Sequence, residues 1–298
     1  MVPGRQALVR FSGPDGLRLS RACVASRKLV RMSKAEAPDR AAPRMSRAAI
    51  PILSYHQVDR PPPRGTPVRS LVLPPWRLAA QLYALRALGW QGLSMRELQP
   101  YLRGERHGKV VGITFDDGYR NNLRHALPVL QRLGFSATVF MVSGQLGGTN
   151  AWDHALGVPA SPLMNAGELR EWIDAGMEVG SHTRHHVNLA QCDDATAREE
   201  ITGSRLDLEA VLGVPVRSFC YPYGSHRPEH AEMVREAGYT SATTVVSART
   251  REGDDLFRLP RVSVELDDPI ARTVLHVATP WLEWRSKRRG AAAVAAAC

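Results

Sequence analysis

The sequence predicts an α/β fold in which parallel strands close into a barrel or a distorted barrel. Short apolar stretches alternate with amphipathic stretches along the 298 residues, and short turns separate them. Regular βα units of this kind build a parallel sheet, and enough of them close it into a barrel. In addition, carboxylate and imidazole side chains directly follow several apolar stretches. The carboxyl ends of barrel strands are where such proteins place their sites.

The individual elements follow from the spacing of the apolar residues. The first strand is predicted at 50–56, and a helix at 75–89, where Trp76, Leu78, Leu82, Leu85 and Leu88 recur near helical spacing. A short helix at 94–102 precedes the regular alternation. Further strands are predicted at 110–115, 137–142, 177–180, 217–221, 240–246 and 258–264, and further helices at 122–133, 168–175, 194–212, 228–237 and around 273–277.

The segment 144–162 interrupts this pattern, because neighbouring glycines and two prolines break any helical period. We expect a loop over the rim of the barrel, where long loops commonly carry specificity. Trp152 in this loop has two open interpretations, which are stacking on a sugar face and packing of the loop against the barrel. His154 has no partner at a metal-binding spacing and is assigned no role.

The composition supports one large α/β domain, which we predict at 49–280. The hydrophobic content of 44% is ordinary for a soluble protein. No stretch approaches the roughly 20 apolar residues of a transmembrane helix. The four cysteines have no paired spacing, which favours a reducing compartment and argues against a zinc knuckle.

The two ends differ from the domain in composition. Residues 1–48 are rich in arginine and proline, so we predict a disordered basic extension, and 281–298 read as a basic, alanine-rich tail. No apolar run of a secretory signal follows either Met1 or Met45, so we expect a cytoplasmic protein.

The net charge of +10 comes largely from these ends. We interpret them as solvated tails, with weak contact to anionic membrane surfaces as the alternative, and predict no nucleic-acid partner.

Two motifs carry the chemical signal. The strand at 110–115 delivers two adjacent carboxylates, Asp116 and Asp117, into a glycine turn. The strand at 177–180 is followed by His182 and His186, and one helical turn between them would direct both rings at one ion. One carboxylate with two neutral imidazoles is the ligand set of a hydrolytic divalent-metal site, and the second carboxylate is left free as a base.

Each motif alone is weak, because Asp-Asp-Gly is a common turn and His-x-x-x-His pairs occur on helix surfaces without a metal. Both follow predicted strands of one alternating chain, however. Together they predict a metal-dependent hydrolase.

A family resemblance rests on three motifs, which are Thr-Phe-Asp-Asp-Gly at 114–118, Ser-His-Thr-Arg-His-His at 181–186 and Tyr-Pro-Tyr-Gly at 221–224. In order and spacing they resemble those of the polysaccharide deacetylases with a NodB homology domain, carbohydrate esterase family 4, over about 50–264. The opening Ile-Leu-Ser-Tyr-His at 52–56 is similar to the circularly permuted poly-N-acetylglucosamine deacetylase branch. The resemblance implies a distorted (β/α) barrel with about seven parallel strands and outer helices.

The resemblance also implies an activity, which is the removal of acetyl groups from N-acetylated amino sugars in a polysaccharide, oligosaccharide or lipid-linked glycan. It assigns the metal to Asp117, His182 and His186, the catalytic base to Asp116, and protonation of the leaving amine to His56. A metal that polarises the amide carbonyl and acidifies water, beside a carboxylate that takes the proton, suits such a poor electrophile. Zinc is favoured, although the ligand set also suits cobalt, nickel and iron.

The third motif is expected to form one wall of the substrate groove. By resemblance, the backbone N–H of Tyr223 helps to hold the oxyanion, with Tyr221 and Pro222 shaping the same loop. A preorganised donor of this kind can contribute a few kcal/mol.

The chain departs from the family in one place. Many members have an arginine that tethers the base carboxylate where this chain has Cys220. Arg217 and Arg261 are possible substitutes, but Arg217 would lie on the opposite face of its strand and nothing in the sequence selects Arg261. No late Asp-x-x-Asp-Trp motif is present, and His276 is interpreted as a structural residue of the terminal helix.

Two other functions remain open on the sequence alone. The same barrel could hydrolyse a small non-sugar amide or cyclic imide, or it could bind saccharides without turnover. The coexistence of Asp116 with a metal ligand set argues against the second. His185 adjoins His186 but has the wrong spacing from His182, so we assign it to the surface or to a position behind the ligands.

Overall fold

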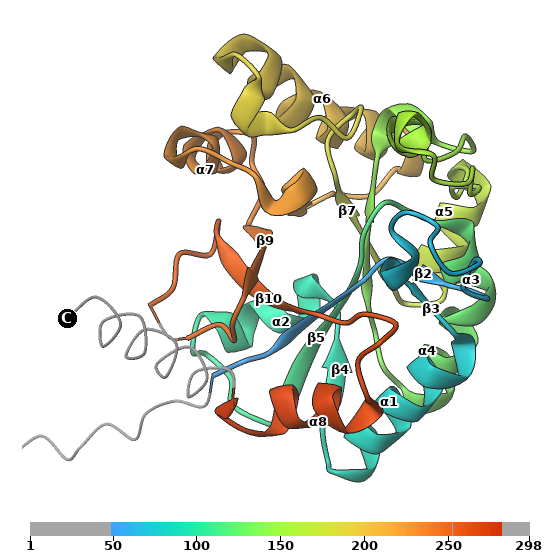
Figure 1. Ribbon diagram of the computed structural model, residues 1–298. Helices are drawn as coiled ribbons and strands as arrows, with labels where there is room; N and C mark the ends of the chain where they lie inside the picture. Colours follow the sequence, from blue (N-terminus) through green and yellow to red (C-terminus); the bar gives the residue numbers. More distant parts are fainter. Residues whose placement is uncertain (1–48, 252, 282–298) are drawn as a thin grey trace, which may run out of the picture. The chain divides into compact units, whose positions relative to one another are not determined.

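Seven parallel strands close into a barrel in the computed structural model, which describes residues 49–251 and 253–281. Figure 1 shows these residues as a coloured ribbon. Around the ring β1 pairs with β5 and with β10, so the first strand of the chain closes the barrel. The predicted distorted barrel of about seven parallel strands is therefore confirmed. The seven strands are β1 (Ile52–Tyr55), β5 (Val110–Phe115), β6 (Thr138–Met141), β7 (Glu178–Ser181), β8 (Ser218–Cys220), β9 (Ser241–Ser247) and β10 (Leu259–Ser263).

Three short strands escaped the sequence analysis. The strand β4 (Gln91–Leu93) pairs with the first residues of β5, on the edge of β5 that β6 occupies further along. The strands β2 (Gln57–Val58) and β3 (Val72–Leu73) pair with each other outside the ring. Two- and three-residue strands give no alternating pattern long enough to detect.

Helices surround the strands (Figure 1) and largely match the predicted ranges. One prediction is wrong, because 122–133 is divided at Ala126 into two helices. Pro128 has no N–H to donate to the carbonyl of Arg124, so the helical ladder is interrupted there. The helices are α1 (Pro75–Ala87), α2 (Met95–Leu102), α3 (Arg120–His125), α4 (Leu127–Leu133), α5 (Ala166–Asp174), α6 (Asp194–Leu212), α7 (Pro228–Glu236) and α8 (Ile270–Ala278).

Five short 3-10 helices complete the described elements. They are η1 (Arg69–Leu71), η2 (Ser143–Gln145), η3 (Ala151–Leu156), η4 (Leu189–Gln191) and η5 (Pro222–Gly224). The segment 144–162 was expected to be irregular, yet η3 lies within it. The short helix is compatible with the glycines and prolines because these lie outside its six residues.

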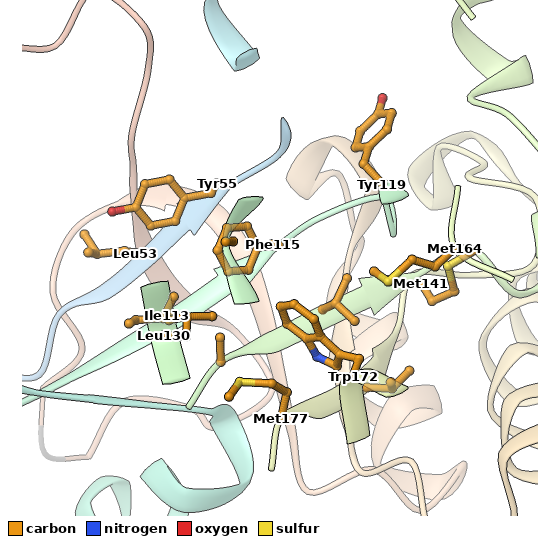
Figure 2. Packing of buried hydrophobic residues seen from close by; sticks show 14 of the residues in the cluster. Leu53, Tyr55, Ile113, Phe115, Tyr119, Leu130, Met141, Met164, Trp172 and Met177 are labelled. Atoms are coloured by element: carbon orange, nitrogen blue, oxygen red, sulfur yellow. The ribbon is translucent and has the colours of Figure 1, made fainter. Parts of the chain in front are cut away.

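Residues alternate between the interior of the barrel and the layer beneath the helices, as side chains on strands must. The larger apolar cluster packs the outer faces of the strands against the helices, and Figure 2 shows part of it around Phe115 and Trp172. The rings of these two residues meet edge to face with centroids 6.1 Å apart. A smaller cluster includes Ile52, Phe140 and Cys220, which alternate with outward-facing residues on their strands. Hydrophobic contacts thus line both faces of these strands.

Several expectations concern parts of the chain that lie outside the described residues, namely the disordered extension at 1–48 and most of the tail at 281–298. The predicted boundaries of the domain, the role of the tails and the cytoplasmic location stay predictions. All described residues belong to one compact unit. Within this part of the chain, no helix combines the length and the apolar composition that a bilayer crossing requires.

Candidate metal centre and active site

The side chains singled out in the sequence follow the carboxyl ends of barrel strands. His56 comes directly after β1, Asp116 and Asp117 come after β5, and His182 comes after β7. In a parallel barrel these ends share one rim, so the fold brings together residues up to 130 positions apart, as His56 and His186 are.

Asp117, His182 and His186 form a compact group of possible metal ligands. The Nε2 atoms of His182 and His186 lie 3.4 and 3.3 Å from Oδ1 of Asp117. All three residues are buried. Three donor atoms converge in a buried position, and no lysine or arginine within 49–251 or 253–281 forms an ion pair with Asp117, which gives the geometry that a divalent cation needs.

The two histidines do not share a helix, contrary to the sequence expectation. Residues 182–188 form a loop, in which Thr183 and His186 adopt left-handed backbone conformations with φ of 66° and 56°. Asp117 and Tyr223 are also left-handed, with φ of 71° and 59°. Non-glycine residues adopt this region rarely, and such strain concentrates at functional sites where surrounding contacts enforce it. The loop, rather than helical periodicity, brings the two rings together.

The remaining ring nitrogens of the histidines are already occupied by protein partners. Nδ1 of His182 donates to the carbonyl of Cys220 at 2.8 Å, and Nδ1 of His186 lies 3.1 Å from the Tyr223 hydroxyl. These bonds hold each ring by one nitrogen and direct Nε2 toward Asp117. Ligating histidines are oriented in this way in metal proteins, so the residues present fit a divalent metal.

Replacing Tyr223 by phenylalanine is expected to weaken metal binding about tenfold, because it removes the partner of His186 Nδ1. Calorimetric titration of the metal-free protein with Zn²⁺ would measure the change. Tyr83→Phe is a suitable control, since Tyr83 is exposed on α1. An unchanged affinity in Tyr223→Phe would show that the hydroxyl does not orient the ring.

Arg261 holds the carboxylate of Asp116 and so supplies the tether that the sequence lacks at Cys220. The guanidinium donates to both carboxylate oxygens of Asp116, at 2.7 and 2.8 Å. Arg261 comes from β10, two strands away from Cys220 on β8, and its terminal nitrogen also lies 3.2 Å from the Cys220 sulfur. A small residue at 220 thus leaves the space that this guanidinium fills. Arg217 instead donates to the carbonyl of Gly238 on the protein surface.

The ion pair also distinguishes the two carboxylates. Burial raises the pKa of Asp116, but the charge and hydrogen bonds of Arg261, together with the charges of His56 and His182, bring the pKa of this carboxyl below its usual value. Asp116, His182 and Cys220 are close enough to form a second ligand set, yet Arg261 already brings a cation to two of the three. Asp117 is therefore the carboxylate open to a metal, and Asp116 is an ionised neighbour with lone pairs to spare.

His56 reaches the same group from the first strand. Its Nε2 lies 3.8 Å from Oδ2 of Asp116, and its side chain keeps about a fifth of its surface exposed. Ser54, two residues earlier on the strand, donates to the same oxygen at 3.4 Å. His56 thus combines contact with the buried carboxylate and access to solvent.

The residues of the third motif, Tyr-Pro-Tyr-Gly at 221–224, lie partly at the candidate metal centre and partly in the hydrophobic core. Pro222 begins the short helix η5, and the turn places the half-exposed Tyr223 beside His186. The ring of Tyr221 is instead buried in the larger core cluster, and its hydroxyl donates to the carbonyl of Phe257 at 3.0 Å. Tyr221 therefore supports the loop from behind, and its side chain does not line the centre.

The segment 144–162 reaches the centre through Trp152, which stacks on the ring of His186 with centroids 4.5 Å apart. Trp152 also packs against the core, as one of its two interpretations required. Asp153 beside it was not foreseen. Burial and the nearby charge of Asp117 raise the pKa of Asp153.

Other histidines lie apart from the ligand group. His185 is mostly exposed and contacts Glu200 of α6 with its Nδ1 at 2.6 Å. His276 is buried in α8 and stacks on Trp281. Sequence reasoning missed Glu200 and did not select Arg261, because each acts across the fold from a position without a local motif.

Comparisons with known proteins show similarity to polysaccharide deacetylases. The family model described as polysaccharide deacetylase matches residues 103–242. The Bacillus subtilis (strain 168) protein YxkH, which carries a provisional polysaccharide deacetylase name, is 26% identical over 219 residues, covering 73% of this chain and 72% of its own length. The poly-beta-1,6-N-acetyl-D-glucosamine N-deacetylase of Staphylococcus epidermidis is 23% identical over 234 residues, covering 72% of this chain and 78% of its own.

A solved structure gives the same result for the fold. The crystal structure of a polysaccharide deacetylase from Bacillus cereus superposes with a TM-score of 0.65 at 25% identity, covering 77% of this chain and 69% of the other. The residues that the family model matches, 103–242, contain all three sequence motifs.

Proposed function

The chain belongs to the polysaccharide deacetylase family, and we propose that it is a metal-dependent hydrolase that removes acetyl groups from N-acetylated amino sugars. The observation that carries the proposal is the convergence of Asp117, His182 and His186 beside an ion-paired Asp116. A free carboxylate next to an open metal position is the arrangement that amide hydrolysis requires. The glycan class follows from relatives named for polysaccharides and for poly-N-acetylglucosamine.

In this proposal Asp117, His182 and His186 hold one divalent ion, with zinc as the first choice. The ion would polarise the acetyl carbonyl and make a water molecule more acidic. Asp116 accepts the proton from this water, and Arg261 keeps the carboxyl ionised and correctly oriented.

The remaining residues act on the other atoms of the amide. His56 donates a proton to the nitrogen as the carbon–nitrogen bond breaks, which its position beside Asp116 and its partial exposure support. The backbone N–H of Tyr223 contributes to holding the carbonyl oxygen as it gains charge. Its φ of 59° turns the peptide sharply at this point of η5.

The substrate class is tested by acetate release from N-acetylglucosamine oligomers. Zn²⁺-reconstituted protein should release acetate, and the same protein after chelation of the metal should not. Stoichiometric zinc binding without acetate would contradict the sugar assignment. Turnover of small amides or cyclic imides would then identify the first alternative, whereas oligosaccharide binding without turnover of any amide would identify the second.

A further inference from the structure

The loop between the two histidine ligands is held from one side by helix α6. Glu200 on this helix is buried, and its Oε2 accepts the backbone N–H groups of Arg184 and His185 at 2.8 and 3.0 Å. Its Oε1 contacts Nδ1 of His185 at 2.6 Å. One carboxylate therefore binds two successive peptide groups of the loop, where two residues are left-handed. Successive N–H groups that converge on an anion stabilise such a backbone bend.

A second attachment of the loop lies at Asp207, about two helical turns after Glu200 along α6. Arg184 forms a two-pronged ion pair with Asp207, at 2.7 and 2.8 Å, and Asp207 also accepts the hydroxyl of Ser143 at 3.1 Å. Glu200, Gly203 and Asp207 are spaced by three and four residues, so they lie on one face of the helix. That face is the one presented to the loop.

Gly203 explains how the arginine can lie across the helix. A Cβ atom at this position would lie only 2.3 Å from Cζ of Arg184. Glycine within a helix costs about 1 kcal/mol relative to alanine. Its presence in the middle of a 19-residue helix is thus accounted for by the guanidinium that it accommodates.

The carbonyl groups of the same loop are held by η2. The N–H groups of Ser143 and Gly144 donate to the carbonyls of Thr183 and Arg184, at 3.1 and 2.9 Å. Left-handed non-glycine residues cost about 1–3 kcal/mol each and persist only where surrounding contacts enforce them. The contacts from α6 and η2 supply this enforcement immediately before His186.

We propose that Glu200 and Asp207 are positioning residues, which hold the loop so that His186 faces Asp117 and the metal. The inference rests on the proposed function only in taking His186 as a metal ligand. In the metal-free protein these contacts would keep the site preformed, so that little ordering is required when the metal binds.

Calorimetric titration of the full chain with Zn²⁺ tests this inference. Glu200→Ala should weaken zinc binding about 10- to 100-fold, as expected for a residue behind the ligands, and Asp207→Asn should weaken it less. Glu199→Ala is the matched control, because Glu199 is the preceding residue, contacts the same arginine at 3.1 Å and is mostly exposed. It should bind zinc like the wild type. Glu200→Gln keeps one acceptor oxygen and should recover part of the lost affinity.

Thermal unfolding of the metal-free variants separates positioning from general destabilisation, because a purely structural role would lower the melting temperature without changing the affinity of the folded protein. At saturating Zn²⁺, acetate release by Glu200→Ala should return toward the wild-type rate. Wild-type affinity in both Glu200→Ala and Asp207→Asn would overturn the inference while leaving the proposed function intact. A wild-type protein that binds no zinc would overturn both.

Discussion

Arg261→Met is expected to destabilise the protein by about 3–5 kcal/mol at neutral pH and to reduce kcat/KM on the order of 10²-fold. The substitution leaves the carboxylate of Asp116 buried without its cation. Methionine fills much of the space of the aliphatic stem, so the loss comes mainly from the unpaired charge. Denaturant unfolding and acetate release would measure the two effects. Arg217→Met is the control, because the side chain of Arg217 is exposed and donates to the surface carbonyl of Gly238.

The difference in stability between Arg261→Met and the wild type should depend on pH, because the ion pair requires an ionised Asp116. In the wild type the pKa of Asp116 is lowered, so its stabilising contribution is present above the unfolded-state pKa of about 3.9 and is lost as pH falls through the folded-state pKa. Without Arg261, burial, which is the largest influence and raises the pKa of Asp116, is opposed only by the charges of His56 and His182. The difference between variant and wild type should therefore be largest at neutral pH and shrink in acid. The acid limb of kcat/KM should also move to higher pH, and an unchanged acid limb would contradict this account.

The strand ends explain why so much of the centre was visible in the sequence. Asp116, Asp117 and His182 each follow an apolar strand directly, and a parallel barrel carries all such positions to one rim. Their proximity therefore required only the correct fold class. The same reasoning puts His56 on this rim, and the structure shows it beside Asp116, although the two residues are 60 positions apart in the chain.

Contacts that cross the fold could not be read in the same way. The choice of Arg261 over Arg217 depends on which strand lies two positions from β8 and on the space left by Cys220. The route of the chain from His182 to His186 depends on left-handed residues and on Glu200 of a distant helix. A four-residue spacing fits a helical turn equally well, so local periodicity predicted that the rings of His182 and His186 lie together but gave the wrong backbone between them.

The roles of the two carboxylates depend most on such contacts across the fold, since Asp116 and Asp117 are adjacent and chemically identical. The structure separates them by their partners, because both oxygens of Asp116 contact Arg261 whereas Asp117 contacts the histidine rings. Neutralising Asp116 and neutralising Asp117 should therefore have different effects on zinc binding and acetate release.

Asp116→Asn is expected to reduce acetate release roughly 10²- to 10⁴-fold, as loss of a general base does, and to leave zinc binding stoichiometric. His182→Ala, measured beside it, should lose zinc binding together with activity, because it removes one of three converging donors. The assay is acetate release at saturating Zn²⁺, with zinc content measured on the same samples.

Asp116→Asn also leaves the guanidinium of Arg261 buried without a counter-charge, so part of its effect could come from instability. The double variant Asp116→Asn with Arg261→Met removes both charges and should be more stable than either single variant, since no unpaired ion remains. If this stabilised double variant is still inactive and still binds zinc, the missing function is proton transfer by Asp116. If Asp116→Asn loses zinc and Asp117→Asn retains it, the roles of the two carboxylates must be exchanged.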